Sequence, residues 1–225
     1  MTRTQSGAAI SALLAALLSG GAFAQIAGDV QRNINQQQRI QDGLRDGSLT
    51  TREAARLERG QGRVERMESR ALRDGSISPD EQHRITAAQD RQSRAIHDQR
   101  NDAQRGDPNS ASSRRMQQDV GRNIHQQQHI ENGIRSGQLT NREVGRLERG
   151  ESRVNRMQAH AGRDGHVGRV EQQRIGRVEN RESRQIHSER HDGQRRGGYQ
   201  PSRFDYGRGD HGFRGNEHNW QRGRG

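Results

Sequence analysis

Apolar residues recur in a narrow stripe along two stretches of this chain. The members of each stripe stand seven, three and four residues apart: Leu57, Val64, Met67 and Ala71 in the first, and Leu147, Val154, Met157 and Ala161 in the second. Such spacing keeps the apolar side chains on one side of a helix with 3.6 residues per turn. The pattern predicts amphipathic helices that pack through thin, coiled-coil-like seams.

The chain contains an internal duplication with a period of 90 residues. Asp29 and Val30 align with Asp119 and Val120, and the match runs without a gap to Arg195, with more than half of the aligned positions identical. A shorter sequence repeat, with a period of about 28 residues, lies inside each copy. The repeated unit is therefore predicted to be three helices joined by two tight turns.

The turns carry the residues that end one helix and begin the next. In the first turn Gly47 suits a left-handed helix end, and Thr50 with Glu53 three residues later forms a capping box. Ser78 and Glu81 repeat this box at the second turn. The two turns predict helix starts near residues 51 and 79.

The second copy repeats only the first of these two boxes. Gly137, Thr140 and Glu143 reproduce the first turn, whereas Gly168 replaces the capping hydroxyl of the second. We expect Glu171 to lack its partner and the last helix to fray at its start.

These patterns predict an all-α protein made of two tandem three-helix units. The expected organisation is a signal peptide (1–24), helical repeat 1 (25–105), a linker (106–117), helical repeat 2 (118–195) and a disordered Arg/Gly/aromatic tail (196–225). With no aromatic residue in either repeat, each unit is thin and marginal alone. Packing between the copies or homo-oligomerisation is expected to supply the missing burial.

The N-terminus has the layout of a secretory signal peptide. Arg3 is followed by an apolar stretch (8–18) and a small-residue site that predicts cleavage after Ala24. We expect a periplasmic or secreted protein without a transmembrane segment in the mature chain. The sequence contains no Cys, which excludes disulfides, thiolate metal ligands and thiol catalysis.

The sharpest feature is a double arginine row in a chain of net charge +11 that contains no Lys. The rows are Arg52, Arg56, Arg59, Arg63, Arg66, Arg70 and Arg73, and Arg142, Arg146, Arg149, Arg153, Arg156 and Arg163. Spacings of three and four, with His160 at the one position of the second row that lacks Arg, place each row along one helix face. Neighbouring arginines in each row repel one another unless acids such as Glu58 and Glu65, or an external anion, neutralise their charge. They indicate either a solvated helix flank or a face that binds an anionic polymer or membrane surface.

Histidine pairs in the second copy are candidate metal ligands. His125 and His129 stand four residues apart, as do His187 and His191, so each pair projects from one helix face. If the two helices are neighbours, four imidazoles converge on zinc or copper. The first copy has Asn35 at the position of His125, so the fold does not require these ligands.

No other cofactor is expected. The turn from Asp42 to Glu53 resembles part of a calcium-binding loop, but Leu44 occupies a ligand position and cannot coordinate. The capping box explains Glu53 better, so we do not expect calcium.

The Leu-Thr-x-x-Glu helix starts resemble the Leu-Thr-x-x-Gln motifs of Spy/CpxP-type periplasmic stress proteins. The likeness covers Leu49, Thr50 and Glu53, and the matching Leu139, Thr140 and Glu143, with Glu where that family has Gln. It implies an exported, helical, basic-surfaced dimer that binds unfolded clients or, in some members, zinc. More broadly, the chain is similar to small exported helical-repeat proteins of proteobacteria, a likeness that implies no activity.

The sequence shows no catalytic constellation, because it has no nucleophile elbow, no phosphate loop with Lys and no plausible carboxylate pair. We therefore expect a non-enzymatic protein that binds lipopolysaccharide, anionic lipid, nucleic acid or acidic polysaccharide. The alternatives are a chaperone-like or metal-binding stress protein and a structural envelope component.

Overall fold

The computed structural model describes residues 10–194, and side chains from residue 23 onward. It is all-helical over this range. The elements in chain order are α1 (Ile10–Asp46), α2 (Thr51–Ala71), α3 (Pro79–Arg100), α4 (Ala111–Arg135), α5 (Asn141–Ala161), a short 3-10 turn η1 (Gly162–Asp164) and α6 (Arg169–His191). No described helix is both long enough and apolar enough to cross a bilayer. The predicted tail (196–225) and most of the predicted signal peptide's side chains lie outside the described residues.

The predicted turns and caps are confirmed at both copies. Gly47 has a φ of 75°, which favours glycine, and the Leu49 amide donates back to the Gly43 carbonyl at 2.8 Å. Thr50 and Glu53 then form a complete capping box at the start of α2. Gly43 is needed here as well, because a Cβ on it would lie 2.6 Å from the Leu49 side chain. The sequence therefore fixes the α1–α2 turn locally.

Two expectations about helix starts are wrong. The segment 106–117 is not all linker, since α4 begins at Ala111 after the Ser110 hydroxyl accepts a hydrogen bond from the Ser113 amide. The serine-rich run is therefore a helix cap. At α6, Glu171 does have a partner, because the Gly168 amide donates to its carboxylate at 2.8 Å. Only the capping hydroxyl is missing there.

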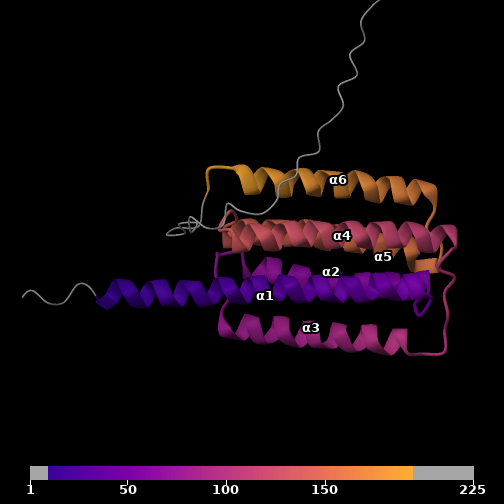
Figure 1. Cartoon of the computed structure of the whole chain (residues 1–225), viewed down its shortest axis with the longest axis horizontal. Helices are drawn as coiled ribbons and strands as arrows, with labels where there is room; N and C mark the ends of the chain where they lie inside the picture. The colour runs from indigo at the N-terminus through magenta and orange to yellow at the C-terminus, as the bar shows by residue number, and fades with distance from the viewer. Residues whose placement is uncertain (1–9, 195–225) are drawn as a thin grey trace, which may run out of the picture.

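The two copies form one bundle, and the most extensive contacts join α2 to α5 and α1 to α4. Figure 1 shows α1 and α4 in front of α2 and α5, with α3 and α6 on the two outer sides. Each outer helix packs on its own copy, α3 on α1 and α2, and α6 on α4 and α5. Packing between the copies therefore supplies the burial that one thin unit lacks, as expected from the sequence.

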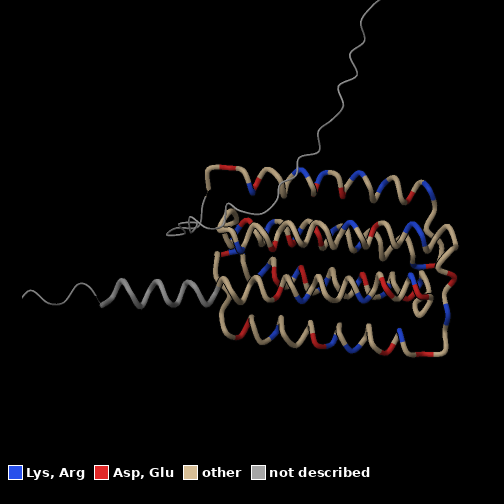
Figure 2. The backbone as a smooth tube through the Cα atoms, in the orientation of Figure 1, with Lys and Arg blue, Asp and Glu red and all other residues tan. Residues whose placement is uncertain are grey.

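The core contains nearly as many buried polar side chains as apolar ones. The apolar stripes are buried as predicted except for Met67 and Met157, which are half-buried. Figure 2 shows acidic and basic residues interspersed along the described helices. Many of the acids point inward, and Asn and Gln side chains donate hydrogen bonds to some of their carboxylate oxygens. This polar core explains how a chain of low apolar content forms a bundle.

The buried polar groups follow the duplication but exchange acid and amide. In the first copy Asn33 and Gln89 donate to the Glu68 carboxylate, at 2.9 and 3.1 Å. At the equivalent positions of the second copy, Gln158 replaces Glu68 and Glu179 replaces Gln89, and the Gln158 amide donates to Glu179 at 3.4 Å. Each cluster therefore keeps one carboxylate, which has moved from the second helix of the unit to the third.

Candidate functional site

The arginine rows lie side by side because α2 and α5 pack antiparallel. At one end the Arg52 guanidinium donates to the Asp164 carbonyl oxygen at 3.0 Å. At the other end Arg142 donates to the Asp74 carbonyl oxygen at 3.2 Å. These two contacts are equivalent under the duplication, so the rows run in opposite directions. We call the two rows together the arginine face, with the thirteen residues predicted from the sequence.

The arginine face is the solvent side of both helices. All of its members are exposed except Arg66, which is half-buried beside the helix contact. Arg73 lies two residues beyond the end of α2 and Arg163 lies in η1, so the two rows extend slightly beyond their helices. Nearly every other position of α2 and α5 is buried. The predicted alignment on one helix face is therefore found in the structure.

A groove of about 620 Å³ separates the rows over part of their length. Its lining residues are Arg66, Ser69, Arg70, Arg73, Arg149, Ser152 and Arg156. Burial and the neighbouring charges of Arg156, Arg70 and Arg63 lower the pKa of Arg66. Such crowding of like charge favours an anion between the helices.

Few of these arginines have an acidic partner. Among the described residues, the one ion pair of the arginine face joins Arg146 to Glu189, at 3.8 Å. The Arg156 guanidinium donates to the Ser152 carbonyl oxygen, which is neutral. The other arginines between the row ends have no side-chain hydrogen bond or ion pair with a described residue: Arg56, Arg59, Arg63, Arg66, Arg70, Arg149 and Arg153.

The two acids named as a possible source of neutralising charge for the rows lie inside the bundle. Glu58 and Glu65 are on α2 but are 0% and 1% exposed, inside the bundle. The Gln37 amide donates to Glu58 at 3.0 Å, and Asn155 donates to Glu65. Burial raises the pKa of Glu58 to about 8, so its carboxyl is largely uncharged at neutral pH. The helix turns both acids away from the row, so Glu58 and Glu65 do not neutralise it.

Small residues spaced seven apart allow the two rows to approach closely. On α2 and α5 the residues at the helix contact are Ala55, Gly62 and Ser69, and Gly145, Ser152 and Ala159. A Cβ on Gly62 would lie 3.1 Å from the Ser152 carbonyl oxygen, and one on Gly145 would lie 2.8 Å from the Leu72 Cβ. The seven-residue spacing of these small residues is present in the sequence, but it lies next to the stripe of larger apolar residues, which dominates the helical pattern.

The comparisons with known proteins do not name a relative. The chain matches no family model, no curated protein and no solved structure. Its function must therefore be argued from the geometry of its own residues.

The four histidines do not form the expected metal site in the described residues. His125, His129 and His187 line one pocket between α4 and α6, and the His191 ring stacks on His187 at 4.2 Å. However, their nitrogens do not come together as a set of three within ligand distance of one another. Arg190 also donates to the His129 Nδ1 at 3.2 Å, and a cation at that atom opposes metal binding. The neighbouring helices therefore bring the pairs near each other without making a tetrahedral set.

The one described cluster with metal-like spacing is acidic and has other partners. Glu143, Glu189 and Asp192 have carboxylate oxygens within 4.8 Å of one another. Glu143 caps α5 by accepting from the Thr140 amide, and Glu189 is the partner of Arg146. Capping therefore accounts for Glu143 and ion pairing for Glu189, and the Asp192 carboxylate accepts from the Gln194 amide. Glu143 has the same capping role as Glu53 in the first copy.

Proposed function

We propose that this chain is an exported, non-enzymatic protein that binds an anionic polymer or surface through the arginine face. The observation that carries the proposal is the pairing of two exposed arginine rows from which the nearby acids are turned away. A row of seven like charges on one helix is unfavourable by itself. A ligand that supplies negative charge removes this repulsion, so the face is suited to binding.

The dimensions of the face fit a polymer better than a small ion. From Arg52 to Arg73 the row advances by 21 residue positions, or about 32 Å at about 1.5 Å per residue. Guanidinium groups bind phosphate and carboxylate oxygens in a bidentate manner. A strand of phosphates or acidic sugars that follows the groove would contact arginines of both helices along its length.

Salt-dependent binding tests this proposal. The probes are a short double-stranded DNA and vesicles containing lipopolysaccharide, each titrated at salt concentrations from about 50 to 200 mM. We expect affinity to fall steeply with salt, and to fall further in a variant with four substitutions to Gln at Arg56, Arg59, Arg63 and Arg66. The slope of log affinity against log salt for DNA should decrease by about 0.9 for each lost phosphate contact.

A control variant has the same net charge but leaves the face intact. Substitution of Arg84, Arg91, Arg94 and Arg174 by Gln removes four exposed arginines of α3 and α6 that have no ion pair with a described residue. Its salt slope should stay close to that of the parent protein. Equal losses in both variants would mean that net charge alone drives binding, and unchanged affinity in both would overturn the proposal.

The bundle is compatible with removal of the signal peptide, which supports export. Ala24 and Gln25 are exposed, whereas Ile26 and Ala27 are the first buried side chains of the described core. Cleavage after Ala24 would therefore leave the core complete. Mass spectrometry of the protein secreted or recovered from a periplasmic fraction should find a chain that begins at Gln25, and an uncleaved cytoplasmic product would contradict export.

A further inference from the structure

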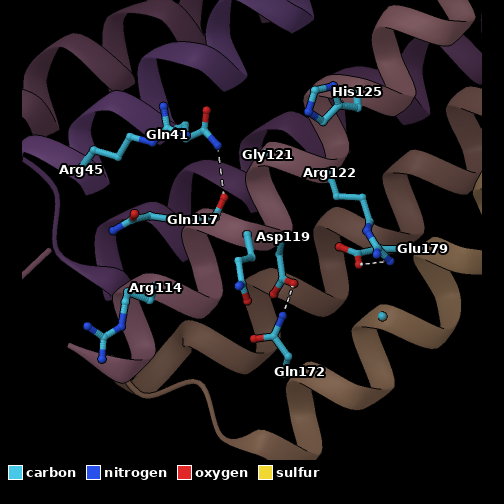
Figure 3. Close-up of a pocket in the computed structure, with 12 residues that line it drawn as sticks. Gln41, Arg45, Arg114, Gln117, Asp119, Gly121, Arg122, His125, Gln172 and Glu179 are labelled. Atoms are coloured by element: carbon cyan, nitrogen blue, oxygen red, sulfur yellow. Dashed lines mark hydrogen bonds and ion pairs between the residues drawn. The ribbon is translucent and has the colours of Figure 1, made fainter. Parts of the chain in front are cut away.

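A second candidate site lies on α4, away from the arginine face. One pocket of about 760 Å³ is lined by residues of α1, α4 and α6, and a second of about 290 Å³ continues between α4 and α6. The two share Arg122 and His125, so they form one groove, which we call the α4 groove. Figure 3 shows Arg45 and Arg114 at one end of its larger part, with Arg122 and His125 at the other. None of its lining residues comes from α2 or α5.

Three residues that line this groove differ between the copies, and two of the differences open it. Gly121 and Gly176 stand where the first copy has Gln31 and Thr86, and His129 stands where it has Arg39. In the first copy the Arg39 guanidinium lies across the corresponding space and donates to the Ser93 hydroxyl at 3.1 Å. The shorter imidazole and the missing side chain at Gly176 leave this space open in the second copy, whereas the Gln41 side chain occupies the space beside Gly121.

The cations of the groove are available to a ligand. The side chains of Arg45 and Arg114 have no hydrogen bond or ion pair with any described residue. Arg190 donates only to neutral acceptors, Gln138 and His129. Arg122 is the exception, because it pairs with Glu179 at 3.2 Å.

The acids of the groove cancel only part of this charge at neutral pH. Burial raises the pKa of Asp119 to about 8, and it raises the pKa of Glu179 to about 7 despite the nearby Arg122. Arg45, Arg114 and Arg190 therefore leave the groove positive, which favours a phosphate or similar oxyanion.

Two buried oxygens at the floor of the groove have no hydrogen-bond partner among the described residues. Asp119 is 1% exposed, and its Oδ1 accepts from the Gln172 amide at 2.5 Å. The Asp119 Oδ2 and the Gln172 Oε1 have no hydrogen-bond partner among the described residues. Buried polar atoms of this kind are normally satisfied. At neutral pH the raised pKa leaves the Asp119 carboxyl protonated, so its Oδ2 can donate a hydrogen bond, whereas the Gln172 Oε1 can accept one. A ligand hydroxyl, which both accepts and donates, could partner both atoms.

We propose that the α4 groove binds a phosphate ester that carries hydroxyl groups, such as a sugar phosphate. The phosphate contacts the arginines that lack acidic partners, and a hydroxyl accepts from the Asp119 Oδ2 and donates to the Gln172 Oε1. This site is independent of the arginine face, so either proposal can fail alone.

Calorimetry on the full chain with glucose 6-phosphate, glucose and inorganic phosphate tests the inference. We expect the ester to bind more tightly than inorganic phosphate and glucose to bind least. No binding of the ester would overturn the site, equal binding of ester and glucose would overturn the role of the phosphate, and equal binding of ester and inorganic phosphate would overturn that of the hydroxyls.

Two variants locate the site. Gly176→Thr restores the residue of the first copy and fills the groove without strain, because a Cβ there has no atom within 4 Å. Arg114→Ala removes an arginine that has no acidic partner among the described residues. Each should weaken binding of the ester by about tenfold. The mirror change Thr86→Gly is the matched control and should leave affinity unchanged. With folding verified by circular dichroism, unchanged affinity in both Gly176→Thr and Arg114→Ala would overturn the assignment.

Discussion

Asn155 donates from its Nδ2 to both carboxylate oxygens of Glu65, at 2.7 and 2.8 Å, although the two residues occupy the same position in the two copies. The Ser152 hydroxyl likewise donates to the carbonyl oxygen of its equivalent, Gly62, at 2.7 Å. Equivalent positions meet only at an axis that relates the copies. The local twofold axis therefore passes between α2 and α5, and Asn155 prevents two buried carboxylates from facing each other there.

A second glutamate at this axis, in place of Asn155, should destabilise the bundle. In Asn155→Glu a second buried carboxylate faces Glu65, and Glu65 loses the hydrogen bonds that Asn155 donates to it. We therefore expect the free energy of unfolding at pH 8 to fall by about 3 kcal/mol or more. Urea denaturation measures this loss. Glu65→Gln is the control, since it removes the charge while keeping an acceptor for Asn155, and it should be tolerated. A stable Asn155→Glu variant at pH 8 would contradict the axis contact.

The stability of the protein should decrease from mildly acidic to alkaline pH. Burial raises the folded-state pKa of Glu58 from 4.5 to about 8, so the protonated form favours folding. This contribution is complete below pH 4.5 and is lost as pH rises to about 8, at about 1.4 kcal/mol for each pKa unit. Thermal melts at pH 5, 6.5 and 8 should show falling melting temperatures, with a shallower decline in Glu58→Gln. A flat profile would contradict the burial of these acids.

Stability should also fall at strongly acidic pH, for a separate reason. Hydrogen bonds from the Ser78 side chain and amide lower the pKa of Glu81, the N3 residue of the α3 cap. A lowered folded-state pKa contributes stability that is lost as pH falls through it. Melts should therefore show an optimum in mildly acidic solution, and Glu81→Gln should remove part of the loss on its acidic side.

The close contact of α2 and α5 should not tolerate a large side chain at Gly62. A Cβ there lies 3.1 Å from the Ser152 carbonyl oxygen, so Gly62→Leu should force the helices apart and destabilise the protein by about 2 kcal/mol. Gly28→Ala is the matched control, because a Cβ at Gly28 has no atom within 4 Å and should stabilise α1 by about 1 kcal/mol. Chemical denaturation compares the two, and equal effects would argue against a tight α2–α5 contact.

The start of α6 lacks only a hydroxyl. Gly168 has extended backbone angles like those of the other caps, and its amide already donates to Glu171. Gly168→Ser should complete the capping box and raise the free energy of unfolding by a few tenths of a kcal/mol. Hydrogen exchange of the first amides of α6 should slow in this variant. Unchanged exchange would show that the missing hydroxyl does not limit this helix end.

The sequence by itself determined the local features of this protein. The turns at Gly47 and Gly137, the capping boxes at Thr50 and Thr140, and the alignment of each arginine row depend on residues close together in the chain. Helical periodicity and capping are short-range effects, so they could be predicted without knowing what each helix packs against.

Only the tertiary structure decided how the copies combine and where the acids lie. Duplicated stripes fit their own copy and the other copy equally well, so the pairing of α2 with α5 could not be predicted from them. Glu58 and Glu65 look like surface acids in a sequence of this charge, yet they are buried because packing on three sides leaves α2 only its arginine row in solvent. Long-range contacts set both outcomes, and one chain's local pattern does not contain them.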